Sequence, residues 1–191
     1  MKVRNADIQK MVVDETRQMI VNRGLKGMNM VDLAKKAGLA KQTLYTIIGS
    51  KEKAIERVVI SQMEKTFGYI NRLVAESGDY REFSKRFIEE APGFLAMVPR
   101  ITLPEVYRDY PAIEKSATDF QRKITRPMLA FFKRGIDEGY IRDDITAEFL
   151  LDLVRGGILE HYIRSGLTGK KLETALGMAF KCIHEGTMVR D

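Results

Sequence analysis

Residues 29–52 of this 191-residue chain carry two short runs of apolar residues at helical spacing, with a glycine between them. The first run comprises Met30, Leu33, Ala34 and Ala37. Asn29 precedes this run and can accept the backbone N–H of Asp32, as an N-cap does; the free N–H groups of this first turn also favour a phosphate. Gly38 follows it, and glycine adopts the left-handed conformation of a helix end at no steric cost. The pattern therefore predicts a short helix from Met30 that ends in a sharp turn at Gly38.

A second helix is predicted from Lys41 to Ile48, with Leu39 anchoring the turn in the core. Its candidate buried residues are Leu44, Ile47 and Ile48, and the remaining positions are Lys41, Gln42, Thr43, Tyr45 and Thr46. Two helices joined by about three residues that include a glycine form the helix-turn-helix of DNA-binding proteins. A helical hairpin without DNA function has the same apolar pattern, so the spacing alone leaves both interpretations open.

The positive charge of the chain is concentrated in the same region. Met1 to Lys53 holds eleven Lys or Arg and five Asp or Glu, an excess of six positive charges. The whole chain has 32 basic and 26 acidic residues, so its net charge of +6 lies entirely in this first quarter. A basic region that coincides with a helix-turn-helix is the electrostatic pattern expected for phosphate binding. A solvated basic face unrelated to nucleic acid is the alternative interpretation.

The N-terminal segment resembles the DNA-binding domain of the TetR family of bacterial transcriptional regulators over about residues 5 to 60. The matching features are a first helix from Ile8 to Arg23, Gly24, Asp32-Leu33-Ala34, Ala37-Gly38-Leu39, Lys41-x-Thr43-Leu44-Tyr45 and Ser50-Lys51-Glu52. Two features depart from the family pattern. Ala40 replaces the usual Ser or Thr, so the second helix lacks an N-cap hydroxyl, and Ile47-Ile48 replaces a His or Tyr followed by an aromatic residue.

The resemblance implies an all-α protein of about nine helices. Residues 1–53 would form a three-helix DNA-binding domain with the helix-turn-helix, and residues 54–191 a larger helical ligand-binding and dimerisation domain. Beyond residue 60 the resemblance consists of an all-helical pattern of the right length. Further helices are expected over residues 52–76, 79–91, 112–138, 147–164 and 171–187, with Asp79 and Thr146 as N-caps. Pro92-Gly93 should end the second of these helices, and Pro127 should kink the third.

Side-chain chemistry assigns roles on the helix from Lys41 to Ile48. Lys41 can donate to guanine O6 or N7, Gln42 can pair with adenine through two hydrogen bonds, and Tyr45 can contact a thymine methyl. Thr43 and Lys51 match phosphate-contacting positions of the family, and such contacts set the register on DNA. The predicted DNA-binding set is Asn29, Lys41, Gln42, Thr43, Tyr45, Thr46 and Lys51.

All five prolines lie between residues 92 and 127, which predicts short helices with breaks between them. Apolar and aromatic side chains are abundant in and around this region, and such side chains line small-molecule pockets. By family resemblance we expect an effector cavity among them, and the predicted ligand-binding set is Phe83, Phe87, Phe94, Met97, Tyr107, Phe120 and Phe131. The alternative is that most of these side chains only pack the core.

The last two predicted helices are apolar around most of their circumference, so each needs packing partners on two sides. Members of the TetR family pair their last two long helices with those of a second subunit in a four-helix bundle. The predicted dimerisation set is Phe149, Leu153, Gly157, Leu172, Leu176, Phe180 and Ile183. A homodimer would present two recognition helices and predicts a roughly palindromic operator.

Other classes of function find little support. His161 and His184 have no spacing that forms a metal site, no nucleophile motif or phosphate loop is present, and we expect no enzyme activity, metal or cofactor. The lone Cys182 excludes an internal disulfide; it is read as a small core hydrophobe, with a redox-sensing thiol as the alternative. No run approaches the roughly 18 apolar residues that span a bilayer, and the start lacks the apolar run of a secretion signal. We therefore expect a cytoplasmic protein with no membrane partner.

The sequence thus predicts a homodimeric, ligand-responsive transcriptional regulator, more specifically a repressor released from double-stranded DNA by a small apolar or aromatic effector. Two other classes stay open. One is an architectural DNA-binding protein of the same fold without a ligand response. The other is a helical small-molecule-binding protein or enzyme that has lost DNA function, for which Ala40 and Ile47 are the only hints.

Overall fold

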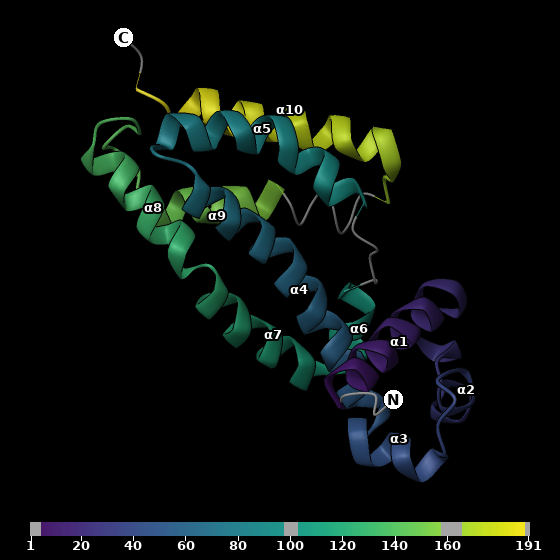
Figure 1. The fold of residues 1–191 in the computed structure, drawn as a ribbon. Helices are drawn as coiled ribbons and strands as arrows, with labels where there is room; N and C mark the ends of the chain where they lie inside the picture. Colours follow the sequence, from purple (N-terminus) through teal and green to yellow (C-terminus); the bar gives the residue numbers. More distant parts are fainter. Residues whose placement is uncertain (1–4, 98–102, 158–165, 190–191) are drawn as a thin grey trace. The chain divides into compact units, whose positions relative to one another are not determined.

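The computed structural model describes residues 5–97, 103–157 and 166–189, and within these ranges the regular elements are helices (Figure 1). They are α1 (Asn5–Gly27), α2 (Met30–Lys36), α3 (Lys41–Ile48), α4 (Lys51–Glu76), α5 (Tyr80–Met97), α6 (Leu103–Asp109), α7 (Pro111–Ile124), α8 (Arg126–Asp137), α9 (Ala147–Gly157) and α10 (Gly169–Thr187). The predicted all-α class is confirmed. Ten helices are described instead of about nine, because residues 112–138 form two helices where one kinked helix was expected.

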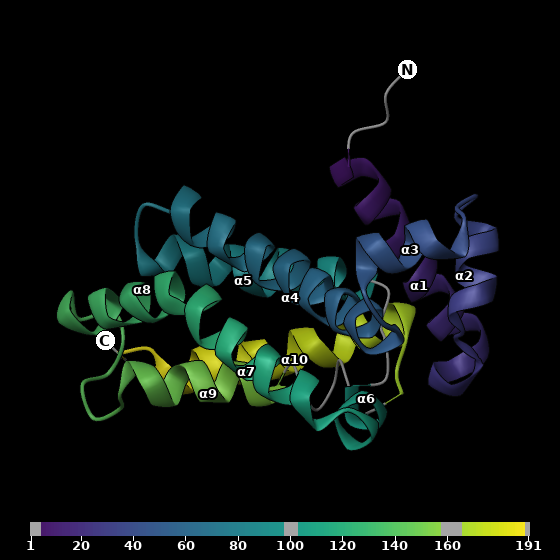
Figure 2. The same cartoon turned by 90° about the horizontal axis from the view of Figure 1, so that it is seen from below.

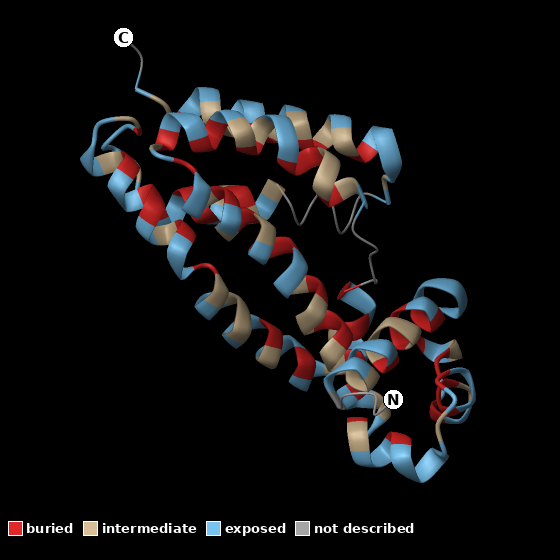
Figure 3. Ribbon diagram, in the orientation of Figure 1, coloured by how far each residue is buried: buried red, intermediate tan, exposed pale blue. Residues whose placement is uncertain are grey.

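The chain folds into two compact units. The first comprises Met1–Met63 and Arg100–Gln121, and the second comprises Glu64–Pro99 and Arg122–Asp191. Two of the three divisions fall inside a helix, one in α4 and one in α7, and the third lies outside the described residues. Each unit has buried apolar residues of its own, which appear as red segments facing neighbouring helices in Figure 3. These units are defined by how the chain packs, which does not show which residues contact DNA. The predicted end of the DNA-binding domain at residue 53 therefore stays a prediction.

Aromatic side chains form the core of the second unit. Rings from α5, α8 and α10 lie with centroids 4.5 to 6.3 Å apart, and the cluster consists of Tyr80, Phe83, Phe87, Phe131, Phe132 and Phe180. Burying each of these rings contributes roughly 2–3 kcal/mol before the entropy cost of ordering. α5 packs along α10, and α8 packs against α9 (Figures 1 and 2). Aromatic packing therefore joins α5, α8 and α10, and α9 packs against α8 through its aliphatic side chains Leu150, Leu151 and Val154, which are buried.

The prediction that Pro92 ends the helix was wrong, since α5 continues through Pro92 to Met97. Proline inside a helix removes a hydrogen bond and costs about 3 kcal/mol. Here the ring is buried, and a Cβ placed on Gly177 of α10 would lie 3.8 Å from Pro92 Cγ. Burial of Ala91, Pro92 and Leu95 against neighbouring helices offsets this cost, so tertiary packing overrides the local preference.

The prediction of one kinked helix over residues 112–138 was also wrong. The helix is interrupted at Thr125, and Pro127 lies in the first turn of α8, where its missing N–H costs no hydrogen bond. The carbonyl of Ile124, at the end of α7, accepts a hydrogen bond from Asn71 Nδ2 at 2.8 Å. A side chain from α4 thus satisfies the backbone where the two helices separate.

The other predicted helices agree with the structure. Asp79 Oδ1 accepts from Glu82 N at 2.8 Å and Thr146 Oγ1 accepts from Phe149 N at 3.1 Å, which confirms both N-caps. α9 is described to Gly157, so its predicted continuation to residue 164, including His161, lies outside the described residues. None of the helices described is long and apolar enough to cross a bilayer.

Candidate nucleic-acid interface

The N-terminus of α2 is held by a closed set of hydrogen bonds. Asn29 is the N-cap, and its Oδ1 accepts from Asp32 N at 2.8 Å while its Nδ2 donates to Asp32 Oδ2 at 3.0 Å. Arg23 Nη1 donates to the same carboxylate oxygen at 3.0 Å. The hydrogen bond from Asn29, with the nearby Arg23, lowers the pKa of Asp32. The predicted cap is confirmed, and the contact of Asn29 with DNA stays a prediction.

A glycine turn sets the direction in which the chain leaves α2. Gly38 has φ of +63°, a left-handed conformation that favours glycine. Gly38 N donates to Lys35 O at 3.2 Å and Leu39 N donates to Ala34 O at 2.9 Å, which is the Schellman arrangement of a helix C-terminus. Leu39 is half-buried. These bonds fix the connection between α2 and α3 and support the predicted helix-turn-helix.

α3 is anchored along one side and exposed along the other. Leu44 and Ile48 are buried, whereas Ile47, which was also expected to be buried, is only half-buried. The exposed side chains are those predicted to face away from the core: Lys41, Gln42, Thr43, Tyr45 and Thr46. Tyr45 is 42% exposed, and Lys41 Nζ lies 6.0 Å from the centroid of its ring. A lysine and a tyrosine thus share one patch at the front of the helix.

The Thr46 hydroxyl and the Gln42 side-chain amide on this helix differ in whether they are free to bond to DNA. Thr46 Oγ1 donates to Gln42 O at 3.0 Å, so its hydroxyl proton is used inside the helix. A phosphate needs a donor, and this rotamer of Thr46 offers none, so we leave Thr46 out of the proposed contacts. The side-chain amide of Gln42 is exposed and bonds to no group in the described part of the chain. Ala40, the N-cap of α3, provides no side-chain cap, as its sequence predicts.

Lysines lie at the start of α3 and in the first turn of α4. Lys53 Nζ contacts Glu56 Oε2 at 2.6 Å, and this bond lowers the pKa of Glu56. Lys51 begins α4 and is half-buried, with no acidic partner among the residues that the structure describes. The same holds for Lys41 within those residues. The positive charge of Lys41 and Lys51 therefore remains available to an external anion.

Solved structures match this chain over nearly its full length. A TetR-family regulator from Cytophaga hutchinsonii aligns over 100% of this chain and 100% of its own, with TM-score 0.73 and 18% identity. A TetR-family regulator from Agrobacterium tumefaciens aligns over 97% and 100%, with TM-score 0.68 and 17% identity. The fatty acid degradation regulator FadR from Bacillus halodurans aligns over 93% of each chain, with TM-score 0.67 and 16% identity. The chain has the TetR fold.

This result confirms, at the level of the fold, the resemblance first identified from the helix-turn-helix. Neither a protein-family model nor a curated protein matches the sequence. At identities of 16% to 18% the shared property is the arrangement of helices, so the residues themselves must carry any argument about function.

The predicted ligand-binding residues occupy three places in this TetR fold. Phe83, Phe87 and Phe131 are buried in the aromatic core of the second unit. Phe94 and Met97 line a groove of about 500 Å³ together with Tyr69. The remaining two, Tyr107 and Phe120, belong to the first unit, where burial raises the pKa of Tyr107 to about 12. The seven residues therefore do not gather in one cavity of either unit, because most of the aromatic rings pack the core.

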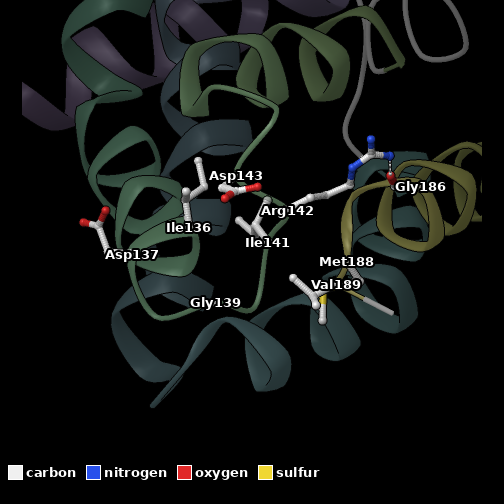
Figure 4. Close-up of a pocket in the computed structure, with 9 residues that line it drawn as sticks. All are labelled: Ile136, Asp137, Gly139, Ile141, Arg142, Asp143, Gly186, Met188 and Val189. Carbon is white, nitrogen blue, oxygen red and sulfur yellow. Dashed lines mark hydrogen bonds between the residues drawn. The ribbon is translucent and has the colours of Figure 1, made fainter. Parts of the chain in front are cut away.

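A second hollow of about 770 Å³ contains none of the predicted ligand residues (Figure 4). Its lining is the end of α8, the connection to α9 and the C-terminal segment, where Ile141 and Met188 form an isolated antiparallel bridge. Arg142 lies at its edge and donates to Gly186 O at 3.2 Å, the dashed line in Figure 4, and to Asp144. Sequence reasoning missed this hollow because a single bridged pair has no periodicity to detect.

Three predicted dimer contacts need correction. Leu172, Leu176 and Phe180 are buried inside the second unit, because α10 uses this stripe to pack along α5. They are not available to a second subunit. Phe149 is 52% exposed and Leu153 is half-buried, whereas Gly157 faces α10, where a Cβ would lie 3.7 Å from Ile183 Cδ1. Of the predicted dimer residues, Phe149 is therefore exposed, Leu153, Gly157 and Ile183 are half-buried, and all four keep some surface that a second subunit could contact.

Cys182 is exposed, so the prediction of a core cysteine was wrong. The buried stripe of α10 advances by four residues from Leu172 to Phe180, which turns Cys182 outward on the same exposed stripe as Met178, which is 61% exposed. His184 is half-buried, and burial lowers its pKa; its Nδ1 is buried without a hydrogen-bond partner in the described structure. Within the described ranges, no three His, Cys, Asp or Glu side chains are placed to hold a metal.

Proposed function

We propose that this protein is a homodimeric, ligand-responsive transcriptional repressor that binds a palindromic operator through α3. One observation carries the proposal: Leu44 and Ile48 seat α3 firmly while its outward side presents exposed hydrogen-bonding groups within a region of net positive charge. An unoccupied polar surface of this kind fits the major groove, which offers donors and acceptors at base edges. α3 is the recognition helix in this proposal.

Two kinds of DNA contact follow from the side chains. Lys41, Gln42 and Tyr45 read base edges, because all three are exposed on α3 and their polar ends are free of intrahelical bonds in the described structure. Thr43 and Lys51 contact phosphates and set the register. Phosphate contacts contribute affinity for any sequence, whereas base contacts distinguish the operator from other DNA.

Dimerisation supplies the second recognition helix. In the described parts of α9 and α10 the large exposed apolar side chains are Phe149 and Met178, and large exposed apolar groups mark protein interaction surfaces. A two-fold symmetric dimer would place two α3 helices in successive major grooves about 34 Å apart on one side of the duplex. The operator would then be an inverted repeat.

A small molecule bound in the second unit regulates DNA binding in this proposal. The structural neighbour from Bacillus halodurans is a fatty acid degradation regulator, which supports an apolar effector here. α4 and α7 each contribute to both units, so a change in either helix can reach the recognition helix. Linkage requires the effector to weaken DNA binding by the same factor by which DNA weakens effector binding.

Selection from genomic fragments at two salt concentrations tests the DNA-binding function. We expect a small number of fragments that share an inverted repeat to be retained at the higher salt concentration. The double variant Lys41→Ala/Gln42→Ala should lose this enrichment, and the control Lys35→Ala/Lys36→Ala, on the exposed side of α2, should keep it. Retention of many dispersed sites would indicate an architectural protein, and no enrichment at either salt concentration would contradict DNA recognition.

A further inference from the structure

A groove between α4 and α5 in the second unit has a composition that limits what can occupy it. We call it the α4–α5 groove, and its volume is about 500 Å³. It is lined by Glu64, Lys65, Gly68, Tyr69, Arg72, Phe94 and Met97. All seven belong to one compact unit, so the groove is defined within that unit alone. The volume is in the range of small-molecule sites.

The floor of the groove is flat and apolar. The rings of Tyr69 and Phe94 are stacked with centroids 3.9 Å apart and planes 10° from parallel. Met97 is 78% exposed at one end, and such exposure of a large apolar side chain is unfavourable in water. A Cβ placed on Gly68 would meet nothing within 4 Å, so this glycine leaves open space beside the stacked rings. The floor therefore suits an elongated or flat apolar group.

The rim of the groove is mainly cationic. Lys65 and Arg72 are seven residues apart on α4, which places them on the same side of the helix two turns apart. Neither has an acidic partner in the part of the chain described, and the Arg72 guanidinium carbon lies 5.8 Å from the Tyr69 ring centroid. Glu90, which accepts from the Tyr69 hydroxyl at 3.4 Å, is already paired with Arg86 at 2.9 Å. Two cations thus border the floor against one lining carboxylate, Glu64.

We propose that the α4–α5 groove binds an amphipathic carboxylate, with its apolar body on Tyr69 and Phe94 and its carboxylate between Lys65 and Arg72. Arg72 is the better partner because a guanidinium can donate two parallel hydrogen bonds to one carboxylate. The hollow in Figure 4 lacks this chemistry, since Arg142 is engaged by Asp144 and Gly186 and the other lining charges are acidic. The binding of a carboxylate in this groove is inferred from the lining residues alone. Its role as the effector rests on the proposed function.

Three ten-carbon probes that differ only in their head group test the charge preference. Decanoate, 1-decanol and decylammonium are titrated into the full chain by calorimetry without DNA, below the concentrations at which they form micelles. We expect decanoate to bind at least about tenfold more tightly than decylammonium, with decanol between them. Equal affinity for decanoate and decylammonium would overturn the proposed head-group site, and so would tighter binding of decylammonium.

A variant that fills the groove separates loss of binding from loss of folding. Gly68→Leu places a side chain in the open space beside Tyr69 and removes a poor helix former, so it should abolish decanoate binding while the thermal midpoint stays the same or rises. The matched control is Gly186→Leu, a substitution of another exposed helical glycine that has nothing within 4 Å of its Cβ position. Unchanged decanoate affinity in Gly68→Leu would overturn the site.

Substitutions at the rim test the two cations separately from the floor. Arg72→Gln and Lys65→Gln should weaken decanoate binding about three- to tenfold and leave decanol binding unchanged. The control Lys171→Gln, an exposed lysine on α10, should alter neither. Equal weakening of both probes would contradict a carboxylate contact.

Adding operator DNA to the same titrations distinguishes this inference from the proposed function. Decanoate binding that Gly68→Leu abolishes, together with a reciprocal loss of DNA affinity, supports both. Decanoate binding without any effect on DNA affinity overturns the effector role of the carboxylate. Specific DNA binding by a chain that binds no decanoate overturns the groove proposal and leaves the DNA-binding function intact.

Discussion

The outward side of α3 and the outward sides of α9 and α10 differ in chemistry, although buried leucines anchor α3 and α10 alike. Leu44 holds α3, which exposes polar groups such as Gln42, whereas Leu176 holds α10, which exposes Met178, with Phe149 exposed on α9. A polar surface can exchange hydrogen bonds with water for hydrogen bonds with DNA at little cost. An apolar surface gains free energy only by leaving water. The contrast is what the proposed function requires, with DNA as the proposed partner of the first surface and a second subunit as the proposed partner of the other.

The largest effect is expected from charges placed on the apolar surface. Phe149→Asp combined with Met178→Asp would bury unpaired carboxylates in a dimer interface, at a cost of about 4 kcal/mol or more, which is roughly a thousandfold in the dimer dissociation constant. Sedimentation velocity should then detect monomers at micromolar concentration. Because both side chains are exposed in one chain, the stability of the monomer should change little.

The same double variant should bind operator DNA far more weakly, since two linked recognition helices bind much more tightly than one. Lys171→Asp, on an exposed position of α10, is the charge control and should remain dimeric. A double variant that still sediments as a dimer would place the interface elsewhere on the molecule.

The second largest effect is expected on stability, when the buried leucines that anchor α3 and α10 are shortened. Leu44→Ala removes a fully buried side chain from the first unit and should cost about 3 kcal/mol of unfolding free energy, as large-to-small core substitutions do. Leu176→Ala should cost a similar amount in the second unit. Urea denaturation followed by circular dichroism measures both, and Val31→Ala, at an exposed position, should lie within about 0.5 kcal/mol of the original chain.

These two variants should differ in DNA binding under conditions where both remain folded. Leu44→Ala weakens the packing of α3, the proposed recognition helix, and should weaken operator binding. Leu176→Ala leaves α3 unaltered. If Leu176→Ala weakened operator binding more than Leu44→Ala at equal stability loss, the exposed side of α3 would not be the main DNA contact.

The helix-turn-helix could be predicted from sequence because its cap, its turn and its apolar stripe each depend on residues a few positions apart. Asn29 and Asp32 are three residues apart, Gly38 determines its own turn, and Leu44 and Ile48 lie one helical turn from each other. Each of these relations is a fixed spacing along the chain, so the residue pattern contains it. The exposure of the polar residues on α3 followed from the same spacing.

The groove and the dimer surface could be predicted only in part, because distant segments build them. Phe94 and Met97 were expected near a ligand, but their partner Tyr69 lies on another helix and no spacing relates the two. The burial of Leu172 and the exposure of Cys182 depend on which side of α10 meets α5. When a helix is apolar around most of its circumference, its sequence does not indicate which side will pack against a neighbouring helix.

A smaller effect should distinguish the proposed base contacts of the polar surface from its proposed phosphate contacts. Gln42→Ala should reduce operator binding about tenfold and leave random DNA unaffected, since each specific base contact contributes about 1–3 kcal/mol of discrimination. Lys51→Ala should weaken both DNAs alike and reduce the slope of log affinity against log salt by about one. Fluorescence anisotropy at four salt concentrations measures both quantities. Equal losses on operator and random DNA from both substitutions would contradict the division of roles.

The smallest effect is a pH dependence that arises on the inward side of α10, at His184, which lies beside the aromatic core and away from the apolar surface. Burial lowers the pKa of His184 below its ordinary value of 6.5, so the folded chain holds the ring neutral over a range in which the unfolded chain protonates it. The unfolded state therefore binds more protons, and stability falls as pH drops through 6.5 towards the folded-state pKa. Below that lower pKa the ring is protonated in both states, and this dependence levels off.

His184→Gln should remove this dependence, because glutamine does not titrate. Urea midpoints between pH 7.5 and 5 should then decline less in His184→Gln than in the original chain. Lys171→Gln, at an exposed position near the other end of the same helix, should leave the pH profile unchanged. A profile equally steep with and without His184 would assign the titration to another group, and it would mean that α10 tolerates a charged ring beside the aromatic core.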